Sequence, residues 1–408
     1  MNSERLAKYA RLALESGVGL QPGQRLLISS QINAAPLVRS ISDLAYRMGS
    51  RYVSVFWEDE TIRRSRFDHA PRDSFSELHE WQAQAANESA EAGDALLGVF
   101  SMDPGLLAGI DPELIQIETR TLESKRERFW ELLGSNTFNW SVIPMATPAW
   151  AAHVFVNDTN AVEKLQAAID HALMIDHADP GRAWAENVNR LKARSQFLNV
   201  KRYASLRYSG LGTKLEVGLA DDHHWDGGGN QLKNGTTYIA NLPTFEIFTA
   251  PHRLRVNGTV RGTKPINANG ELVEGWSLEF KDGRVVNAHA ARGLAGLEGI
   301  LDTDENSRFL GEVALVPSGS PVDQTGLVFR NTLMDENAAS HIAVGFAYRT
   351  SIRGGGDMSG EEFTAKGGNR SMEHRDVMIG SSDVEIDGVF ADGSSEPLMR
   401  NGQFAFEE

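Results

Sequence analysis

The first half of the chain alternates between two hydrophobic patterns. Short apolar runs of the kind found in buried strands are separated by longer segments whose apolar residues recur every three to four positions, as they do in a helix. We predict strands at residues 25–29, 51–57, 94–100 and 139–144. We predict helices at residues 6–14, 34–48, 161–174 and 183–193. Strands that alternate with helices predict an α/β layer with a parallel sheet.

The pattern changes after about residue 204, where glycine becomes frequent and short β-patterned pieces follow one another. These pieces are residues 206–210, 213–219, 237–243, 256–262, 273–280 and 283–290. Tight turns are predicted at VNGT, KDGR and IDGV. We therefore expect an N-terminal α/β domain with a mostly parallel sheet at residues 1–195. A C-terminal α+β domain with a mixed sheet is expected at residues 196–408.

The composition argues against several classes of protein. The 408 residues include no cysteine, which excludes disulfides and thiol nucleophiles and leaves any metal to oxygen and nitrogen ligands. A net charge of −15 without a cluster of Lys or Arg argues against nucleic acid or an anionic membrane as partner. The N-terminus predicts an amphipathic helix rather than a signal peptide, and no stretch approaches the roughly 20 apolar residues of a membrane span. We expect a cytoplasmic protein.

Several familiar motifs are missing from the sequence. No G-x-G-x-x-G and no P-loop follows the first predicted strand, so the first half is interpreted as a scaffold rather than a nucleotide-binding domain. There is no H-E-x-x-H pair on a helix and no G-x-S-x-G elbow, so neither a helical zinc peptidase nor serine chemistry is predicted.

His374 and Asp376 lie in EHRDVMIGS, a short strand-like segment. Their spacing of two puts both side chains on one face, with Arg375 and Val377 on the other. An imidazole and a carboxylate on one face can share a metal ion, although a surface His–Asp pair would have the same spacing.

His341 and Tyr348 lie further back, in DENAASHIAVGFAY. The spacing of Ala338, Ile342 and Gly345 favours a buried helix or turn that begins near His341. Tyr348 would then lie two helical turns further on the same face, where its phenol could donate to an oxyanion. The alternatives are a core histidine and an ordinary half-buried tyrosine.

Glu246 and Glu312 are each embedded in apolar residues, in NLPTFEIFTAPHR and GEVALVP. A buried carboxylate without a partner costs several kcal/mol or takes up a proton, so a cation is a natural partner. Alternatively each glutamate is exposed or paired with Arg253 or Arg308. The His223–His224 pair in DDHHWDGGG is a weaker candidate, because adjacent side chains on a strand point apart.

Taken in order, these phrases resemble the thermophilic metallo-aminopeptidase family, the aminopeptidase T and aminopeptidase S group. The resemblance rests on NLPT-x-E-x-FTAPHR, LGEVALVP, DENAASHIA-x-G-x-AY and GGN-x-S-x-x-H-x-D-x-MIGS. It extends into the first half through YARLALESGVGLQPGQ and FNWSVIPMATPAWA.

The resemblance implies an aminopeptidase that removes N-terminal residues from peptides with two divalent metal ions per chain, Zn, Co or Mn. The implied ligands are Glu246, Glu312, His341, His374 and Asp376, with Tyr348 in the active site. Five ligands for two metals require a shared carboxylate, which we expect to be Glu312. The resemblance also implies a homodimer that acts on peptides with a free N-terminus.

The sequence departs from the pattern that we expect in relatives at three positions behind the ligands. Phe245 stands where a second acidic residue is expected, and Arg375 and Val377 stand where apolar or aromatic residues are expected. An alternative on the same fold is a ring-cleaving dioxygenase with one iron held by two histidines and Asp376, or an aromatic amine hydrolase. A scaffold that binds metal or peptide without turnover is the non-enzymatic alternative.

Overall fold

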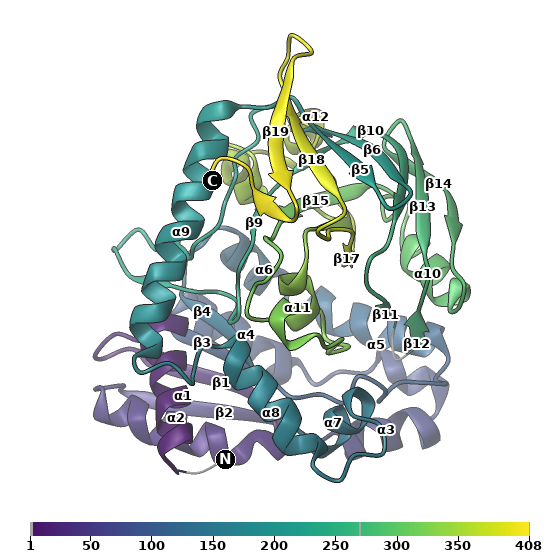
Figure 1. Ribbon diagram of the computed structural model, residues 1–408. Coiled ribbons are helices and arrows are strands. Elements are labelled where there is room, and N and C mark those ends of the chain that lie inside the picture. The colour runs from purple at the N-terminus through teal and green to yellow at the C-terminus, as the bar shows by residue number, and fades with distance from the viewer. Residues whose placement is uncertain (1–2, 269–270, 408) are drawn as a thin grey trace. The chain divides into compact units, whose positions relative to one another are not determined.

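The computed structural model describes residues 3–268 and 271–407, and its chain forms two compact units (Figure 1). Unit 1 comprises residues 1–185 and 229–243, and unit 2 comprises residues 186–228 and 244–408. The predicted domain boundary at residue 195 lies within helix α9 (Pro180–Lys201), along which the chain passes from unit 1 to unit 2. The division into domains 1–195 and 196–408 stays a prediction.

Unit 1 is built around a four-stranded sheet in the order β2-β1-β3-β4, and all its neighbours are parallel. The strands are β1 (Arg25–Gln31), β2 (Tyr52–Glu58), β3 (Ala95–Phe100) and β4 (Trp140–Pro144). Each overlaps a predicted strand, and the parallel α/β prediction is confirmed. Central apolar residues such as Ile28 of β1 and Leu97 of β3 are buried, as expected for the inner strands of a parallel sheet.

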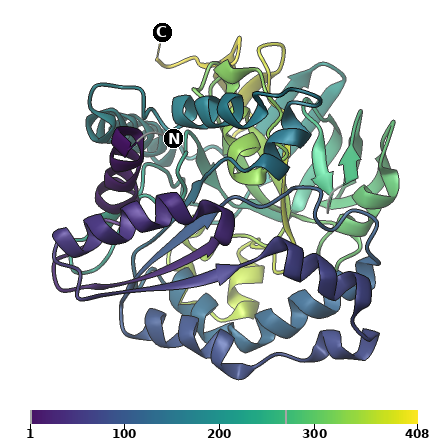
Figure 2. The ribbon, with the colours of Figure 1, turned by 90° about the horizontal axis from the view of Figure 1, so that it is seen from below.

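Helices connect and flank these strands, and Figure 2 shows this unit from below. They are α1 (Ser3–Arg11), α2 (Ala35–Arg47), α3 (Glu60–His69), α4 (Glu80–Glu91), α5 (Pro112–Lys125), α6 (Glu127–Gly134), α7 (Pro148–Val154) and α8 (Ala161–Ala172). A π-helical segment, η1 (Leu12–Gly17), continues α1, and Tyr9 donates a hydrogen bond to the carbonyl of Pro144 at the end of β4. Within the described residues, no helix combines the length and apolarity of a membrane span.

A later segment of the chain returns to unit 1 and extends its sheet. Val142 of β4 donates to Ala240 and accepts from Leu242, so Asn241 pairs in parallel with the free edge of β4. The two short strands of this region are β7 (Asn230–Gln231) and β8 (Thr237–Tyr238). The strand predicted at residues 237–243 is therefore mostly wrong, because only its first two residues join a strand ladder.

Unit 2 contains an eight-stranded antiparallel sheet in the order β14-β13-β10-β6-β5-β18-β19-β20. Its strands are β5 (Ser205–Gly210), β6 (Thr213–Leu219), β10 (Pro251–Arg261), β13 (Ser277–Lys281), β14 (Arg284–His289), β18 (Glu385–Val389), β19 (Ser395–Arg400) and β20 (Gln403–Phe404). A two-stranded ribbon of β11 (Ile266–Ala268) and β12 (Glu271–Val273) accompanies it.

A second antiparallel sheet of unit 2 has the order β17-β16-β15-β9. Its strands are β9 (Ile247–Thr249), β15 (Leu310–Leu315), β16 (His341–Gly345) and β17 (His374–Met378). Short helices α10 (Leu294–Leu301), α11 (Thr332–Asp335) and α12 (Gly360–Ala365) lie in the connections. Val313, Ile342 and Val377 of this sheet share one hydrophobic core with Val217 and Val256 of the larger sheet. One face of the four-stranded sheet therefore packs into the hydrophobic core.

Two of the three predicted turns are wrong. KDGR does form the turn between β13 and β14, but VNGT lies inside β10 and IDGV lies inside β18. The glycines in these strands instead allow a neighbouring side chain or backbone to approach the strand closely. A Cβ on Gly388 would lie 2.5 Å from the ring of Tyr203, and one on Gly258 would lie 2.1 Å from the carbonyl oxygen of Lys214.

We therefore expect Gly388→Ala to destabilise unit 2 by about 1–3 kcal/mol, because the added methyl overpacks the buried Tyr203 ring. As a control, a methyl added at Gly299 in α10 would have no atom within 4 Å. Gly299→Ala should leave stability unchanged or raise it by up to about 1 kcal/mol, because alanine favours helix. Calorimetric melting of both variants checks this contrast, and equal melting temperatures would contradict it.

Candidate metal centre

One face of the four-stranded sheet in unit 2 brings together all five predicted metal ligands. The antiparallel register sets Ala343 of β16 opposite both Glu312 of β15 and Asp376 of β17. It also sets His374 opposite Gly345. Because side chains alternate along a strand, His341, Glu312, His374 and Asp376 project from the face opposite the core. Glu246 immediately precedes β9 and joins them.

The five side chains form two groups that share Glu312. Donor atoms of Glu246, Glu312 and His341 lie within 4.8 Å of one another, and so do those of Glu312, His374 and Asp376. Nε2 of His341 lies 3.1 Å from Glu246 Oε2 and 3.6 Å from Glu312 Oε1. Nε2 of His374 lies 3.8 Å from Glu312 Oε2 and 3.5 Å from Asp376 Oδ1. The two oxygens of Glu312 therefore face different histidines.

Both imidazoles are oriented by backbone carbonyls. Nδ1 of His341 lies 3.1 Å from the carbonyl oxygen of Ala339, and Nδ1 of His374 lies 2.8 Å from that of Phe346. A carbonyl oxygen only accepts, so Nδ1 carries the proton in each ring. The lone pair of each Nε2 is then directed into the cluster when the ring is neutral, which is the arrangement of a metal-binding histidine.

The cluster is buried and strongly polar. Glu246, Glu312, His341 and Asp376 are each at most 8% exposed. Although burial disfavours the imidazolium, the nearby carboxylates raise the pKa of His341 well above its usual value, and that of His374 to about 9. Burial raises the pKa of Glu312, whereas His374 helps to lower that of Asp376 to about 2. Positive charge in this cluster is thus strongly favoured.

Two buried atoms of the cluster have no hydrogen-bond partner, Glu246 Oε2 and His341 Nε2. They lie 3.1 Å apart without the geometry of a hydrogen bond. The alternatives proposed for the glutamates do not occur. Arg308 pairs with Glu298 and Asp302, and Arg253 donates to Asn306, so neither arginine neutralises Glu246 or Glu312.

The helix or turn predicted to begin near His341 is wrong, because residues 341–345 form the inner strand β16. A completely buried strand is apolar on both faces apart from its functional residue, which removes the alternation that would have identified it. Tyr348 therefore does not lie two helical turns from His341. Its ring nevertheless reaches the cluster, 5.1 Å from that of His374 and 5.9 Å from that of Phe248.

Tyr348 is 38% exposed, so it lies at the boundary between the cluster and solvent. The pKa of Tyr348 is raised above its usual value by partial desolvation of the phenol and by the negative charge of Glu312 and Asp376. The phenol consequently keeps its proton at neutral pH and can act as a hydrogen-bond donor.

Glu336 is a further carboxylate beside the cluster that we did not single out from the sequence. It opens the short helix η5 (Glu336–Ala338) and is 8% exposed. Burial raises its pKa well above the usual value, and the charges of Asp376 and Glu246 raise it further. The neighbouring Asn337 accepts from the N–H of Phe245, which ties η5 to the residue before Glu246. The signal in the sequence is the acidic pair Asp335–Glu336, which lies a few residues before the buried strand β16.

The first member of that acidic pair has a structural role. Asp335 accepts hydrogen bonds from the N–H groups of Phe329 and Asn331, and burial raises its pKa to about 6.

The positions behind the ligands are also resolved. Phe245 and Val377 are buried, and Arg375 forms a 3.5 Å ion pair with Glu373.

His223 lies outside both donor groups among the described residues. Its Nδ1 contacts the carbonyl oxygen of Ala220, and burial lowers its pKa to about 4.

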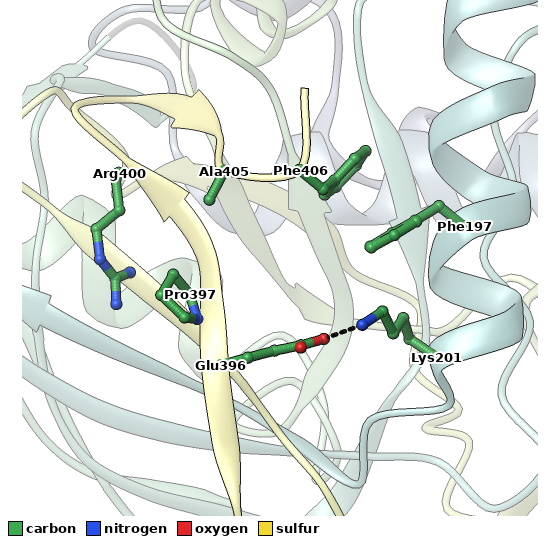
Figure 3. Close-up of a pocket in the computed structure, with 7 residues that line it drawn as sticks. All are labelled: Phe197, Lys201, Glu396, Pro397, Arg400, Ala405 and Phe406. Carbon is green, nitrogen blue, oxygen red and sulfur yellow. Dashed lines mark hydrogen bonds and ion pairs between the residues drawn. The ribbon is translucent and has the colours of Figure 1, made fainter. Parts of the chain in front are cut away.

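A separate hollow of unit 2 is lined by Phe197, Lys201, Glu396, Pro397, Arg400, Ala405 and Phe406 (Figure 3). Its charged groups are already engaged, Lys201 with Glu396 and Arg400 with Asp387. The rings of Phe197 and Phe406 stack with centroids 3.9 Å apart. This hollow therefore lacks a free charged group for chemistry.

Comparison with solved structures supports the fold. The wild-type AmpT from Thermus thermophilus matches with a TM-score of 0.92 at 39% identity, covering 98% of this chain and 99% of that one. A 2,5-dihydroxypyridine dioxygenase from Pseudomonas putida matches with a TM-score of 0.55 at 13% identity, covering 99% and 98% of the two chains. The second match is a likeness of fold alone.

Comparison with relatives of known name agrees with the resemblance in the sequence. The chain is 45% identical to aminopeptidase 2 of Geobacillus stearothermophilus over 404 residues, 98% of each chain. It is 41% identical to aminopeptidase T of Thermus aquaticus over 408 residues, again 98% of each. The model of the thermophilic metalloprotease family, M29, matches residues 2–404. Because nearly all of its residues are matched in this way, the chain belongs to the thermophilic metalloprotease (M29) family.

Proposed function

We propose that this protein is a metal-dependent aminopeptidase that releases N-terminal residues from peptides at a site for two divalent cations. The observation that carries the proposal is the position of Glu312, which belongs to two donor groups and turns one oxygen toward each histidine. The names of the relatives, which are aminopeptidases matched over nearly their full length, support the reaction.

The residues of the cluster fit divalent cations. The unpartnered atoms Glu246 Oε2 and His341 Nε2 would both serve as metal ligands, and burying them without a partner is costly. Burial also concentrates negative charge that neither Arg253 nor Arg308 neutralises. We propose that Glu246 and His341 hold one cation, His374 and Asp376 hold the other, and Glu312 is shared. Oxygen and nitrogen donors of this kind accept Zn, Co or Mn.

Divalent cations in such a site polarise the scissile carbonyl and make water a nucleophile near neutral pH. The protein would supply the proton transfers. Glu336 belongs to neither donor group, and its raised pKa suits a carboxylate that takes a proton from the attacking water. The same proton can then pass to the leaving amine. The Tyr348 phenol, which keeps its proton, would donate to the oxyanion.

Negative charge in the cluster also suits the substrate's charged end. A protonated α-amine would be attracted to the buried carboxylates, and a neutral one would suit a bound cation, so either form would favour cleavage at the N-terminus. The alternative of a single-iron dioxygenase has only a shared fold in its favour. The homodimer and the cytoplasmic location that we expect from the sequence stay predictions.

The test of this function is metal dependence. We expect chelation to abolish hydrolysis of aminoacyl arylamides, and Zn, Co or Mn to restore it. Glu312→Ala should lower activity by more than about 100-fold and reduce the bound metal, because both groups lose a donor. Metal analysis with a screen of aminoacyl substrates measures both.

The matched control is Glu279→Ala, which removes an exposed carboxylate from β13 and should change neither metal content nor activity. The metal-free Glu312→Ala protein should melt no lower than the metal-free parent, because the variant loses like-charge repulsion in a buried cluster. Near-parental activity of Glu312→Ala, or one iron per chain without peptidase activity, would contradict the proposal.

The role of Glu336 has its own test. Glu336→Gln keeps the shape but not the basicity of the side chain, so we expect kcat to fall by about 100-fold to 10,000-fold. Metal content and KM should stay close to those of the parent. Steady-state kinetics together with metal analysis separates this result from loss of a ligand.

Asp335→Asn is the control for the same acidic pair. Asp335 accepts hydrogen bonds from the backbone N–H groups of Phe329 and Asn331. Its substitution should therefore lower the melting temperature and leave kcat close to that of the parent. If Glu336→Gln instead loses metal while keeping its turnover per bound metal, Glu336 is a ligand and not the proton carrier.

A further inference from the structure

The strand that carries two of the proposed ligands lies at the edge of its sheet. In the order β17-β16-β15-β9, β17 pairs only with β16 among the described residues. The five pairs between β16 and β17 run from His341–Met378 to Gly345–His374 without a register shift. The other side of β17 is therefore an unpaired edge, and an edge strand displays N–H and C=O groups that another strand can use.

Two hydrogen bonds at the ends of this ladder establish which groups face outward. Phe346 donates its N–H to the carbonyl of Glu373, and Ile379 donates its N–H to the carbonyl of Ser340. Residues that exchange hydrogen bonds alternate along an antiparallel pair. The backbone groups that hydrogen-bond to β16 are thus those of residues 373, 375, 377 and 379. The backbone groups that face the open edge are those of His374, Asp376 and Met378.

One end of the open edge is closed and the other is not. The carbonyl of Met378 accepts from the N–H of Thr263, which confirms that it faces outward. The N–H of His374 contacts the carboxylate of Glu373 at 3.2 Å. The carbonyl of His374 and both backbone groups of Asp376 have no hydrogen bond to any described residue outside the strand ladder. The side chains of these same two residues belong to the proposed metal centre.

Asp376 makes this edge unusual because it is only 8% exposed. Backbone N–H and C=O groups that lie away from water are nearly always paired in folded proteins, so the unpaired groups of Asp376 are available to a partner strand. An open acceptor–donor–acceptor row, formed by His374 C=O, Asp376 N–H and Asp376 C=O, matches the main chain of an extended peptide.

We propose that the edge of β17 binds the main chain of the peptide substrate, which adds to the sheet as an extended strand. This inference rests on the proposed aminopeptidase function and specifies its preferred substrate as an extended peptide rather than a single aminoacyl group. Backbone pairing is independent of side chains, so it lets one site hold many sequences. The hydrogen bond between Thr263 and Met378 limits the pairing to the part of the edge beside the ligands.

The experiment compares a series of alanyl substrates, from alanine arylamide to penta-alanine, on the metal-loaded protein. We expect kcat/KM to rise with length and then level off once the short edge is filled. In penta-alanine, N-methylation at residue 3 or at residue 4 should differ, because only alternate residues of a strand face its neighbour. One of the two should lower kcat/KM by about tenfold, the value of one lost hydrogen bond, and the other by less than about twofold.

Ester analogues control for the bulk of the methyl group, because they remove the same N–H without adding an atom. A second readout avoids turnover altogether. In metal-free protein saturated with penta-alanine, the amide of Asp376 should exchange hydrogen more slowly than in the free protein. Amides of β14, the edge strand of the other large sheet, should not change.

The outcomes separate the two proposals. Equal effects of the two methylations, together with unchanged exchange at Asp376, would overturn pairing at β17 while leaving the aminopeptidase intact. Hydrolysis of no substrate in the series would overturn the proposed function, and hydrogen exchange in the metal-free protein would still decide whether peptide binds this edge.

Discussion

The two faces of one four-stranded sheet determine the organisation of unit 2. Successive side chains of a strand point in opposite directions, so each of β15, β16 and β17 supplies both faces at once. Val313, Ile342 and Val377 enter the hydrophobic core, and Glu312, His341 and Asp376 project from the opposite face. A slip of one residue in any strand would bury a charge in the core and remove a donor from the cluster. The packing of the core therefore also fixes the geometry of the site.

This arrangement has an electrostatic consequence. Carboxylates gathered in a buried place repel one another, and burial alone favours their neutral forms. The imidazoles of His341 and His374 partly offset this repulsion, and their pKa values are raised by the carboxylates of Glu246, Glu312 and Asp376. Yet Glu246 Oε2 and His341 Nε2 still have no hydrogen bond. A cluster that its own side chains satisfy incompletely has the chemistry that could hold a cation.

Much of this could be predicted from the sequence, and the failures have physical causes. The parallel strands of unit 1 were predictable because apolar runs bounded by helical segments have few other interpretations. His374 and Asp376 were placed correctly because a spacing of two has a definite meaning on a strand. The strand at His341 was misjudged because complete burial removes periodicity. The turns predicted at VNGT and IDGV are wrong because glycine occurs both in turns and where a neighbour packs closely against the backbone. Only the contacts of Gly258 with Lys214 and of Gly388 with Tyr203 distinguish the two cases.

Glu336 could not be found by spacing, because its relation to Glu246 depends on contacts between segments far apart in the sequence. The same is true of the open edge of β17, which is visible only once the sheet order is known. Here the geometry of antiparallel pairing links two properties. His374 and Asp376 occupy the positions where the backbone groups turn away from β16, and at such positions the side chains of paired residues approach most closely. The register of β17 against β16 thus has two effects. It places the side chains of His374 and Asp376 close to Gly345 and Ala343, and it leaves the backbone groups of the same two residues unpaired on the side where a peptide would bind.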